Sequence, residues 1–273
     1  MPEREKTVVV KFGGSAMDNA ERKSEVLQDV LALRCEGVKV VLCHGGGPAI
    51  NEMLKTLDIP VRFVNGLRYT SDEIMRVVEM VLIGQVNTEL VGSLTALGGR
   101  AVGLSGVSGG LFQCHQKSEE LGRVGEIDAV DTTAMDALLS AGFIPVVAPI
   151  GTDGHGTSYN INGDTAAAKL ASALRADELI LLTDMEGVCN SVELHDVISY
   201  LHVRDVPILK ERGVIQGGMI PKIDGCVEAV HQGVGSVRIV DGREAHSLLR
   251  SFSQECGTTI GTARESVGIK EVY

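Results

Sequence analysis

Short apolar runs rich in Val, Ile and Leu alternate with longer segments of helical spacing along most of the chain. The runs that predict buried strands are 7–12, 38–43, 101–104, 143–148, 178–183 and 237–240. The segments that predict helices are 20–36, 49–57, 71–97, 132–140, 163–174, 203–212, 220–232 and 245–252. This alternation predicts right-handed crossovers. We therefore expect an α/β fold, an open three-layer αβα sandwich with a mainly parallel central sheet.

Two further runs, 111–115 and 124–130, alternate between apolar and polar residues on either side of a polar turn, which predicts an antiparallel flap. No linker and no repeat interrupts the order of strands and helices. We place a functional division near residue 175. It gives an N-terminal lobe (1–175) and a C-terminal lobe (176–273) that share one continuous sheet.

The first two expected strands end in glycines that are suited to binding anions. Gly13-Gly14 follows the first strand, and Gly45-Gly46-Gly47 follows the second. Glycine lets backbone N–H groups approach an anion closely, and the helix that follows adds partial positive charge at its N-terminus. Lys11 adds a full charge at the same edge of the sheet. We therefore expect a site for two anions, or for one large one.

The formal net charge of −11 argues against non-specific binding to nucleic acids or to anionic membranes. An acidic chain that binds phosphates must concentrate its positive charge locally, which singles out Lys11, Arg68 and Lys222. No segment approaches the ~18–20 uninterrupted apolar residues that span a bilayer. Residues 1–6 carry acids and no apolar core, so we expect no signal or transit peptide.

The six cysteines show neither C-x-x-C nor metal-ligand spacing. We therefore expect reduced thiols, a cytoplasmic location and no metal site built from protein ligands. Two nucleotide-binding motifs, G-x-x-x-x-G-K-[ST] and G-x-G-x-x-G, are missing from the sequence. The absence of the second argues against a dinucleotide-dependent oxidoreductase.

Glycine-flanked polar residues remain at the expected strand ends and helix starts, in segments 65–68, 160–164, 183–187 and 217–222. Alone, most have plainer explanations. Asp164 would cap the helix that follows it, Arg68 would lie on the surface, and Gly13-Gly14 would form a tight turn. Lys222 is different, because a lysine near a helix start opposes the helix dipole and needs an anionic neighbour.

Taken together, seven segments resemble the amino acid kinase family over nearly the whole chain. They are V-K-F-G-G-S (10–15), H-G-G-G-P (44–48), N-G-L-R-Y-T (65–70), V-G-E-I (124–127), N-I-N-G-D-T-A-A (160–167), L-L-T-D-M-E-G-V (181–188) and G-G-M-I-P-K (217–222). The combination of N-G-L-R-x-T with N-x-N-x-D is similar to the branch of the family that acts on N-acetyl-L-glutamate.

The resemblance implies a kinase that phosphorylates the γ-carboxylate of N-acetyl-L-glutamate to N-acetyl-L-glutamyl 5-phosphate, a step of arginine biosynthesis. Its phosphoryl donor would be ATP, with Mg²⁺ bound mostly through the phosphates. It implies that Lys11, Lys222 and Asp164 are catalytic and that Gly46, Gly47, Arg68 and Asn160 bind the acyl amino acid. It implies that ATP is bound by Gly13, Gly14, Gly45, Thr183, Asp184, Met185, Glu186, Gly187, Val188, Val214, Ile215 and Gln216. The N-terminal lobe would then bind the acyl amino acid and form the dimer, and the C-terminal lobe would bind ATP.

Two departures from the family bear on regulation. Arginine-inhibited members carry an extra N-terminal helix that builds a hexameric ring, whereas only ten residues precede Lys11 here. Those members also carry a Glu shortly after a C-terminal His, and the stretch after His246 has no acid. We therefore expect a homodimer without arginine feedback. A PII-type regulatory partner is possible, although nothing in the sequence supports it.

Two other functions stay open at this point. A kinase of the same fold would act on another acidic substrate, such as aminoadipate on a carrier protein, glutamate, aspartate or a nucleoside monophosphate. A catalytically inactive metabolite sensor would keep the scaffold, but it would have no need for Lys11, Lys222 and Asp164 together.

Overall fold

The computed structural model describes residues 5–14, 17, 19–191, 195–253 and 256–262. Most of the N-terminal stretch expected to lack a targeting signal therefore lies outside the described residues. The core of the fold is an eight-stranded sheet. Its strands in spatial order are β14 (Tyr200–His202), β16 (Thr258–Gly261), β15 (Ser236–Asp241), β11 (Glu178–Thr183), β1 (Thr7–Phe12), β2 (Lys39–His44), β8 (Ile144–Ala148) and β5 (Ala101–Ser105).

This sheet is mainly parallel, as the strand–helix alternation predicts. All six expected strands lie in it, and the only antiparallel pair among its described neighbours is β15 with β16. The edge strand β14 and its neighbour β16 were not predicted. They contain three and four residues, which is too short for an alternating or apolar run to stand out.

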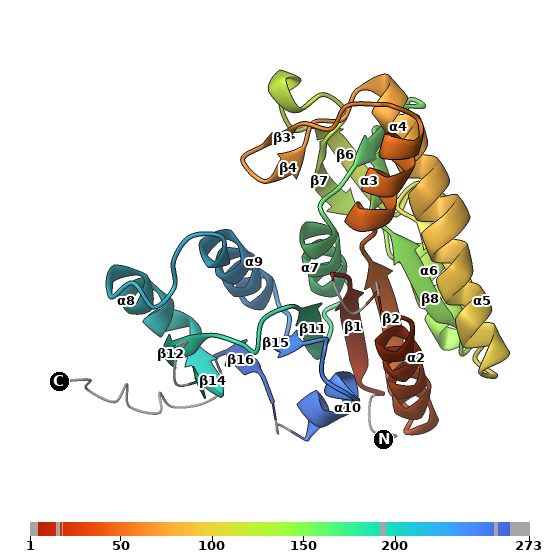
Figure 1. Cartoon of the computed structure of the whole chain (residues 1–273). Coiled ribbons are helices and arrows are strands. Elements are labelled where there is room, and N and C mark those ends of the chain that lie inside the picture. The colour runs from red at the N-terminus through yellow and green to blue at the C-terminus, as the bar shows by residue number, and fades with distance from the viewer. Residues whose placement is uncertain (1–4, 15–16, 18, 192–194, 254–255, 263–273) are drawn as a thin grey trace.

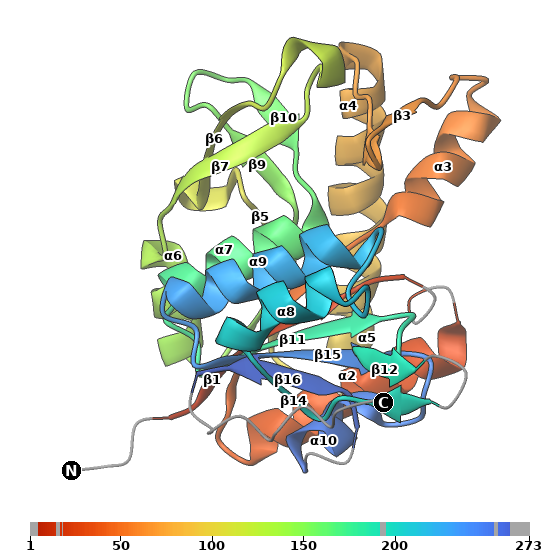
Figure 2. The same ribbon diagram turned by 90° about the vertical axis from the view of Figure 1, so that its left-hand side faces the viewer.

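Helices cover both faces of the sheet and complete the three layers (Figures 1 and 2). One face carries α6 (Thr133–Ser140), α7 (Gly163–Ala173), α8 (Val206–Glu211) and α9 (Met219–His231). The other carries α2 (Ala20–Cys35), α3 (Gly47–Thr56), α4 (Asp72–Glu79), α5 (Thr88–Ala96) and α10 (Ser247–Phe252). Figure 2 shows α7 and α9 above the strands, with α2 and α10 below them.

Strand β1 divides the core between the two faces. Val9 packs with α7 and α9 in one apolar cluster, while Val8 and Val10 pack with α2 in the other. Because side chains alternate along a strand, Lys11 shares the face of Val9 and points towards α7. The position of this lysine is therefore set by the register of its strand.

The segment expected as one helix over 71–97 is continuous but not uniform. Between α4 and α5 lies an eight-residue π-helical stretch, η1 (Met80–Asn87). The expected cap is confirmed, since the Ser71 hydroxyl accepts the Ile74 N–H at 3.2 Å. By length and composition the 25-residue helix could cross a membrane, but 44% of its most apolar window is buried inside the fold. A helix that packs on the core of a protein has the same combination of length, apolar composition and burial.

The predicted antiparallel flap is confirmed and is larger than expected. Its two strands, β6 (Phe112–Gln116) and β7 (Gly125–Val130), pair antiparallel, and β9 (Ile150–Thr152) and β10 (Ser158–Asn160) extend them to a four-stranded sheet. The smaller elements are the hairpins β3 (Phe63–Val64) with β4 (Leu67–Arg68) and β12 (Cys189–Ser191) with β13 (Asp196–Val197), and the 3₁₀ turns η2 (Ser108–Gly110), η3 (Glu119–Leu121) and η4 (Val203–Asp205). The expected helix over 203–212 is divided between η4 and α8.

Candidate active site

Lys11 reaches from the end of β1 towards the first turn of α7. Its ammonium lies 3.0 Å from Oδ1 of Asp164. A β-carbon at Gly13 would lie only 2.8 Å from the Lys11 Nζ, so the glycine lets the ammonium rest against the backbone. The side chain is 14% exposed, which leaves it close to solvent while its carboxylate partner fixes its direction.

Lys222 approaches the same carboxylate from the C-terminal half of the chain. Its Nζ donates a hydrogen bond of 2.8 Å to Oδ2 of Asp164. The lysine stands in the first turn of α9, where the helix dipole opposes a positive charge. The anionic neighbour that the sequence predicted for it is therefore Asp164, and the packing of α9 on α7 brings the two together.

The alternative that Asp164 merely caps its helix is wrong. The cap of α7 is Asn162, whose Oδ1 accepts the N–H groups of Asp164 at 3.0 Å and of Thr165 at 3.1 Å. An asparagine in this position satisfies the free donors of the first turn. The carboxylate of Asp164 is thereby left for the two lysines.

The trio Lys11–Asp164–Lys222 carries a net positive charge. Burial raises the pKa of Asp164, but the two ammonium groups outweigh it and hold that pKa below its ordinary value, so the carboxylate is ionised at neutral pH. Its Oδ1 is buried and has no aligned hydrogen-bond donor among the described residues. The contact of this atom with Lys11 is therefore mainly Coulombic. Two cations on one anion attract a further negative charge.

Arg68 is a buried cation whose recorded hydrogen bonds are to neutral groups. Its side chain donates to the Asn51 Oδ1 at 2.6 Å and to the Gly47 carbonyl at 3.3 Å, and its guanidinium stacks 5.0 Å from the ring centre of Phe63. The residue is 8% exposed, and burial lowers its pKa. Among the ion pairs of the described residues none involves Arg68. The surface position considered for it is wrong, and a buried guanidinium without a carboxylate favours an anionic ligand.

A cavity of about 200 Å³ joins Arg68 to the other residues expected to bind the acyl amino acid. Its lining includes Gly46, Gly47, Arg68 and Asn160, together with Leu82 and Ile161. The Asn160 amide donates to the Thr70 hydroxyl at 3.2 Å, and that hydroxyl donates to the Arg68 carbonyl at 3.0 Å. The four residues expected to bind the acyl amino acid therefore line one cavity, and Asn51 and Thr70 support them, although neither was singled out in the sequence.

This cavity meets a larger cleft of about 630 Å³ between the flap, α7 and α9. The two share Gly66, Leu67, Val124 and Asn162 in their linings, and Asp164 and Lys222 line the cleft. The cavity at Arg68 therefore adjoins the cleft that two members of the charged trio line. Among the described residues, no three His, Cys, Asp or Glu side chains gather as a metal site would require.

The residues expected to bind a nucleotide lie in separate parts of the structure. Gly13 and Gly14 follow β1 and Gly45 follows β2, and of these three Gly13 lies against the Lys11 side chain. Thr183 is the last residue of β11, and Asp184 to Val188 follow it. The side chain of Val188 is buried in the core, as is that of Ile215. Glu186 lines a separate cavity of about 310 Å³ with Asp241 and Glu244. None of the residues 183–188 and 214–216 lines the 630 Å³ cleft.

The chain is similar in sequence and in structure to known proteins. Residues 6–241 match the model of the amino acid kinase family. The chain is 47% identical to acetylglutamate kinase of Clostridioides difficile (strain 630), over 94% of this chain and 90% of that one, and 47% identical to acetylglutamate kinase of Heliobacterium modesticaldum (strain ATCC 51547 / Ice1), over 94% and 91%. Among solved structures it resembles smu.665 of Streptococcus mutans UA159, with 31% identity, a TM-score of 0.79, and coverage of 94% of this chain and 99% of that one. Carbamate kinase of Giardia lamblia, at 19% identity, shares the fold with a TM-score of 0.69 over 94% and 99%.

We predict that Asp164→Asn destabilises the protein at pH 7 by about 1–2 kcal/mol, because it leaves two half-buried ammonium groups facing each other. The pKa of Asp164 is lower in the folded protein than in the unfolded chain. The stability that its carboxylate contributes is therefore present above the unfolded-state pKa of about 4, and it is lost as the pH falls through the folded-state pKa. Urea denaturation at a series of pH values measures the difference between variant and wild type, which shrinks below about pH 4. Asp224→Asn, which breaks the exposed Lys210–Asp224 pair, is the control and changes stability by less than about 0.5 kcal/mol. A gap that stays constant from pH 7 to pH 3 would contradict the assignment.

Proposed function

The chain belongs to the amino acid kinase family, and from this premise we propose that it transfers the γ-phosphoryl group of ATP to the γ-carboxylate of N-acetyl-L-glutamate. The product is N-acetyl-L-glutamyl 5-phosphate, an intermediate of arginine biosynthesis. The observation that carries the proposal is the buried Arg68, whose cavity adjoins the cleft lined by Asp164 and Lys222 of the trio Lys11–Asp164–Lys222. The relatives named acetylglutamate kinase support the choice of acceptor.

The reaction needs little proton chemistry from the protein. A γ-carboxylate is already ionised at pH 7, so it attacks without a general base. A bond forms between a carboxylate oxygen and the γ-phosphorus, the bond from that phosphorus to the β,γ-bridging oxygen breaks, and ADP leaves with the electron pair. The difficulty is that two anions must meet, which makes positioned positive charge the main requirement.

The lysines of the trio supply that charge from two sides. Lys11 comes from β1 and Lys222 from α9, so a transferring phosphoryl group between them is contacted from both halves of the chain. Asp164 orients both ammonium groups and remains ionised. The N–H groups of Gly46 and Gly47, at the start of α3, lack intrahelical acceptors and add donors to the same region.

The acyl amino acid would lie in the 200 Å³ cavity. Arg68 would bind its α-carboxylate in the bidentate manner that a guanidinium favours, and Asn160 would bond to its amide. Leu82 and Ile161 line the same cavity and would pack against the acetyl group and the aliphatic chain.

Mg²⁺ fits a site of this kind. The single carboxylate of the trio is occupied by two lysines, and the described residues form no cluster of acids that would enclose a metal ion. Such a site suits a cation that binds chiefly through the phosphates of ATP and there neutralises their charge. Gly13, Gly14 and Gly45 would receive the phosphates, and Thr183, Asp184, Met185, Glu186, Gly187, Val188, Val214, Ile215 and Gln216 would surround the nucleoside.

The two lobes would then bind different substrates, the first the acyl amino acid and the second the nucleoside of ATP. Arg68 and Asn160 belong to residues 1–175, and the nucleoside-binding segments belong to residues 176–273. Lys11 and Lys222 meet where the lobes adjoin. The six cysteines are free thiols, which supports a cytoplasmic location.

We propose further that the chain forms a homodimer through the outer face of the helix 72–96. Met80, Ile83 and Leu97 are large apolar side chains exposed on or next to this helix, and a second copy would cover them. A monomeric mass in analytical ultracentrifugation would refute this assembly.

The experiment that tests the proposed function is an acceptor screen. Purified protein is incubated with Mg·ATP and N-acetyl-L-glutamate, glutamate, aspartate, aminoadipate or a nucleoside monophosphate, and ADP release is followed by a coupled assay. We expect turnover with N-acetyl-L-glutamate at least about 10²-fold faster than with glutamate, since a cavity built for an amide leaves its polar groups unpaired with the amine. Turnover only with another acid would assign a different kinase, and binding without turnover would assign a sensor.

Replacing either lysine should reduce catalysis more than binding. We expect Lys11→Ala and Lys222→Ala to lower kcat by about 10²–10³-fold while the KM values change by less than about fivefold, because their charge is used mainly in the transition state. Lys210→Ala, which removes an exposed lysine paired with Asp224, is the matched control and keeps the wild-type kcat. Full turnover in either variant of the trio would remove the assigned role.

Arg68→Ala should instead act on the acceptor. We expect the KM for N-acetyl-L-glutamate to rise by about 30-fold or more with a smaller change in kcat, because the guanidinium binds a carboxylate that does not react. Arg62→Ala, at an exposed arginine stacked on Tyr69 near the same hairpin, should leave this KM unchanged. An equal rise in both variants would point to a general loss of positive charge.

A further inference from the structure

His44 lies at the end of β2 but points away from the reacting groups. Val41 and Cys43 belong to the cluster beneath α7 and α9, whereas Val40 and Leu42 belong to the opposite one. By the same alternation, His44 faces the layer of α4, η1 and α5. The side chain is fully buried there, on the other side of the sheet from Lys11.

Two hydrogen bonds fix the imidazole in one tautomer. Its Nδ1 lies 2.7 Å from the Gly45 carbonyl, which can only accept, so Nδ1 carries the hydrogen. Its Nε2 lies 3.1 Å from the Asn87 Nδ2, which can only donate. The orientation of the Asn87 amide is settled by the Val146 carbonyl at 2.8 Å, which requires the NH₂ group on that side. Burial lowers the pKa of His44 to about 4, so the ring is neutral at physiological pH.

Two hydrogen bonds to the backbone of Gly45 hold the glycine loop 45–47 in place. The Gly45 carbonyl is bound by His44, and the Gly45 N–H donates to the Phe12 carbonyl at 2.8 Å. Both peptide groups of Gly45 are thus fixed. The next residue, Gly46, is packed against Leu82, because a β-carbon at Gly46 would overlap Cδ2 of that leucine.

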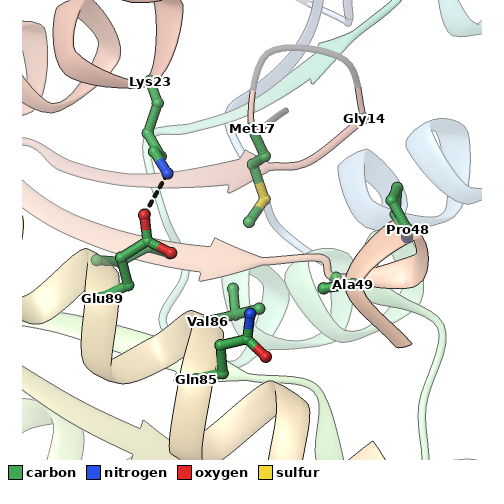
Figure 3. A pocket seen from close by; sticks show the side chains of 10 residues that line it. Gly14, Met17, Lys23, Pro48, Ala49, Gln85, Val86 and Glu89 are labelled. Atoms are coloured by element: carbon green, nitrogen blue, oxygen red, sulfur yellow. Dashed lines mark hydrogen bonds and ion pairs between the residues drawn. The ribbon is translucent and has the colours of Figure 1, made fainter. Parts of the chain in front are cut away.

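The π-helical stretch explains why Leu82 and Asn87 can both reach this loop. They are five residues apart, which in an α-helix would place them about 140° apart around the axis. The i→i+5 bonds of a π-helix bring residues at this spacing close to the same face. Figure 3 shows the outer side of the contact between η1 and the glycine loop. Gln85 and Val86 of η1 face Met17 and Ala49 there across a pocket of about 90 Å³. Gly103 leaves room for Asn87, since a β-carbon there would overlap its Oδ1.

We propose that the His44–Asn87 pair, presented by the π-helical stretch, is a positioning element that holds Gly45 so that the Gly46 and Gly47 N–H groups are aimed at the transferring phosphoryl group. This inference rests on the proposed function, and it adds to it two residues that touch neither substrate. Donors fixed before the reaction stabilise developing charge without reorganising, so a small displacement of the loop reduces the rate of transfer.

Two isosteric variants separate the bond to Gly45 from the bond to Asn87. The amide nitrogen of Asn stands where Nδ1 stands in His, whereas the amide of Gln reaches the position of Nε2, where its oxygen accepts from Asn87. His44→Asn therefore keeps the donor to the Gly45 carbonyl, and His44→Gln loses it. We expect His44→Gln to lower kcat by about 10²-fold, with KM values within about threefold, and His44→Asn to recover at least a tenth of the wild-type kcat. Leu33→Ala, a cavity variant in the buried face of α2, serves as the control that lowers Tm and leaves kcat unchanged.

The outcomes decide the inference. Wild-type kcat in folded His44→Gln, or equal losses in the two variants, would overturn it. If both variants fail to fold, ¹⁵N NMR of the wild-type imidazole decides in their place: Nδ1–H without titration from pH 5 to 8 supports the bond to Gly45, and Nε2–H overturns it. If wild-type protein phosphorylates none of the acceptors, the proposed function fails, while the NMR result still reports on the pair.

Discussion

One carboxylate shared by two lysines is the constraint on which the site depends. Asp164 stands at the start of α7, and its partners come from β1 and from α9, elements that lie far apart in the sequence. The three side chains meet only if the register of β1 directs Lys11 towards α7 and α9 packs on α7. The same arrangement leaves an uncompensated positive charge at the carboxyl edge of the sheet, although the chain as a whole is acidic.

The two faces of β1 and β2 have separate tasks. Towards α7 and α9, the strands present the charged Lys11, which contacts Asp164. Towards η1, they present a neutral histidine that contacts backbone alone within the glycine loop. A parallel sheet allows this division because consecutive side chains are directed to opposite layers. The glycine loop that follows β2 contacts His44 and Leu82 on the side of η1.

Much of this could be predicted from the sequence, because the signals are local. Runs such as 178–183 are apolar throughout and coincide with β11. The unfavourable position of Lys222 near the start of a helix predicted an anionic partner. The structure shows that this partner is Asp164. What could not be predicted depends on distant contacts. Strands β9, β10, β14 and β16 are too short to carry a periodic signal, and the pairing of His44 with Asn87 spans 43 residues. The choice between Asn162 and Asp164 as the cap of α7 also required the structure, since both residue types favour that position.

The position of β16 has a consequence for biosynthesis of the protein. This strand is the last described element of the chain, yet it lies inside the sheet between β15 and β14, and β16 is the only described strand with which β14 pairs. Residues 200–202 can therefore join the sheet only after residues 258–261 have been synthesised. Strands β1, β2, β5 and β8 have all their neighbours in the sheet as soon as β11 (residues 178–183) has been synthesised. The nascent chain would thus complete the half of the sheet from β1 to β5 first and close the edge at β14 last.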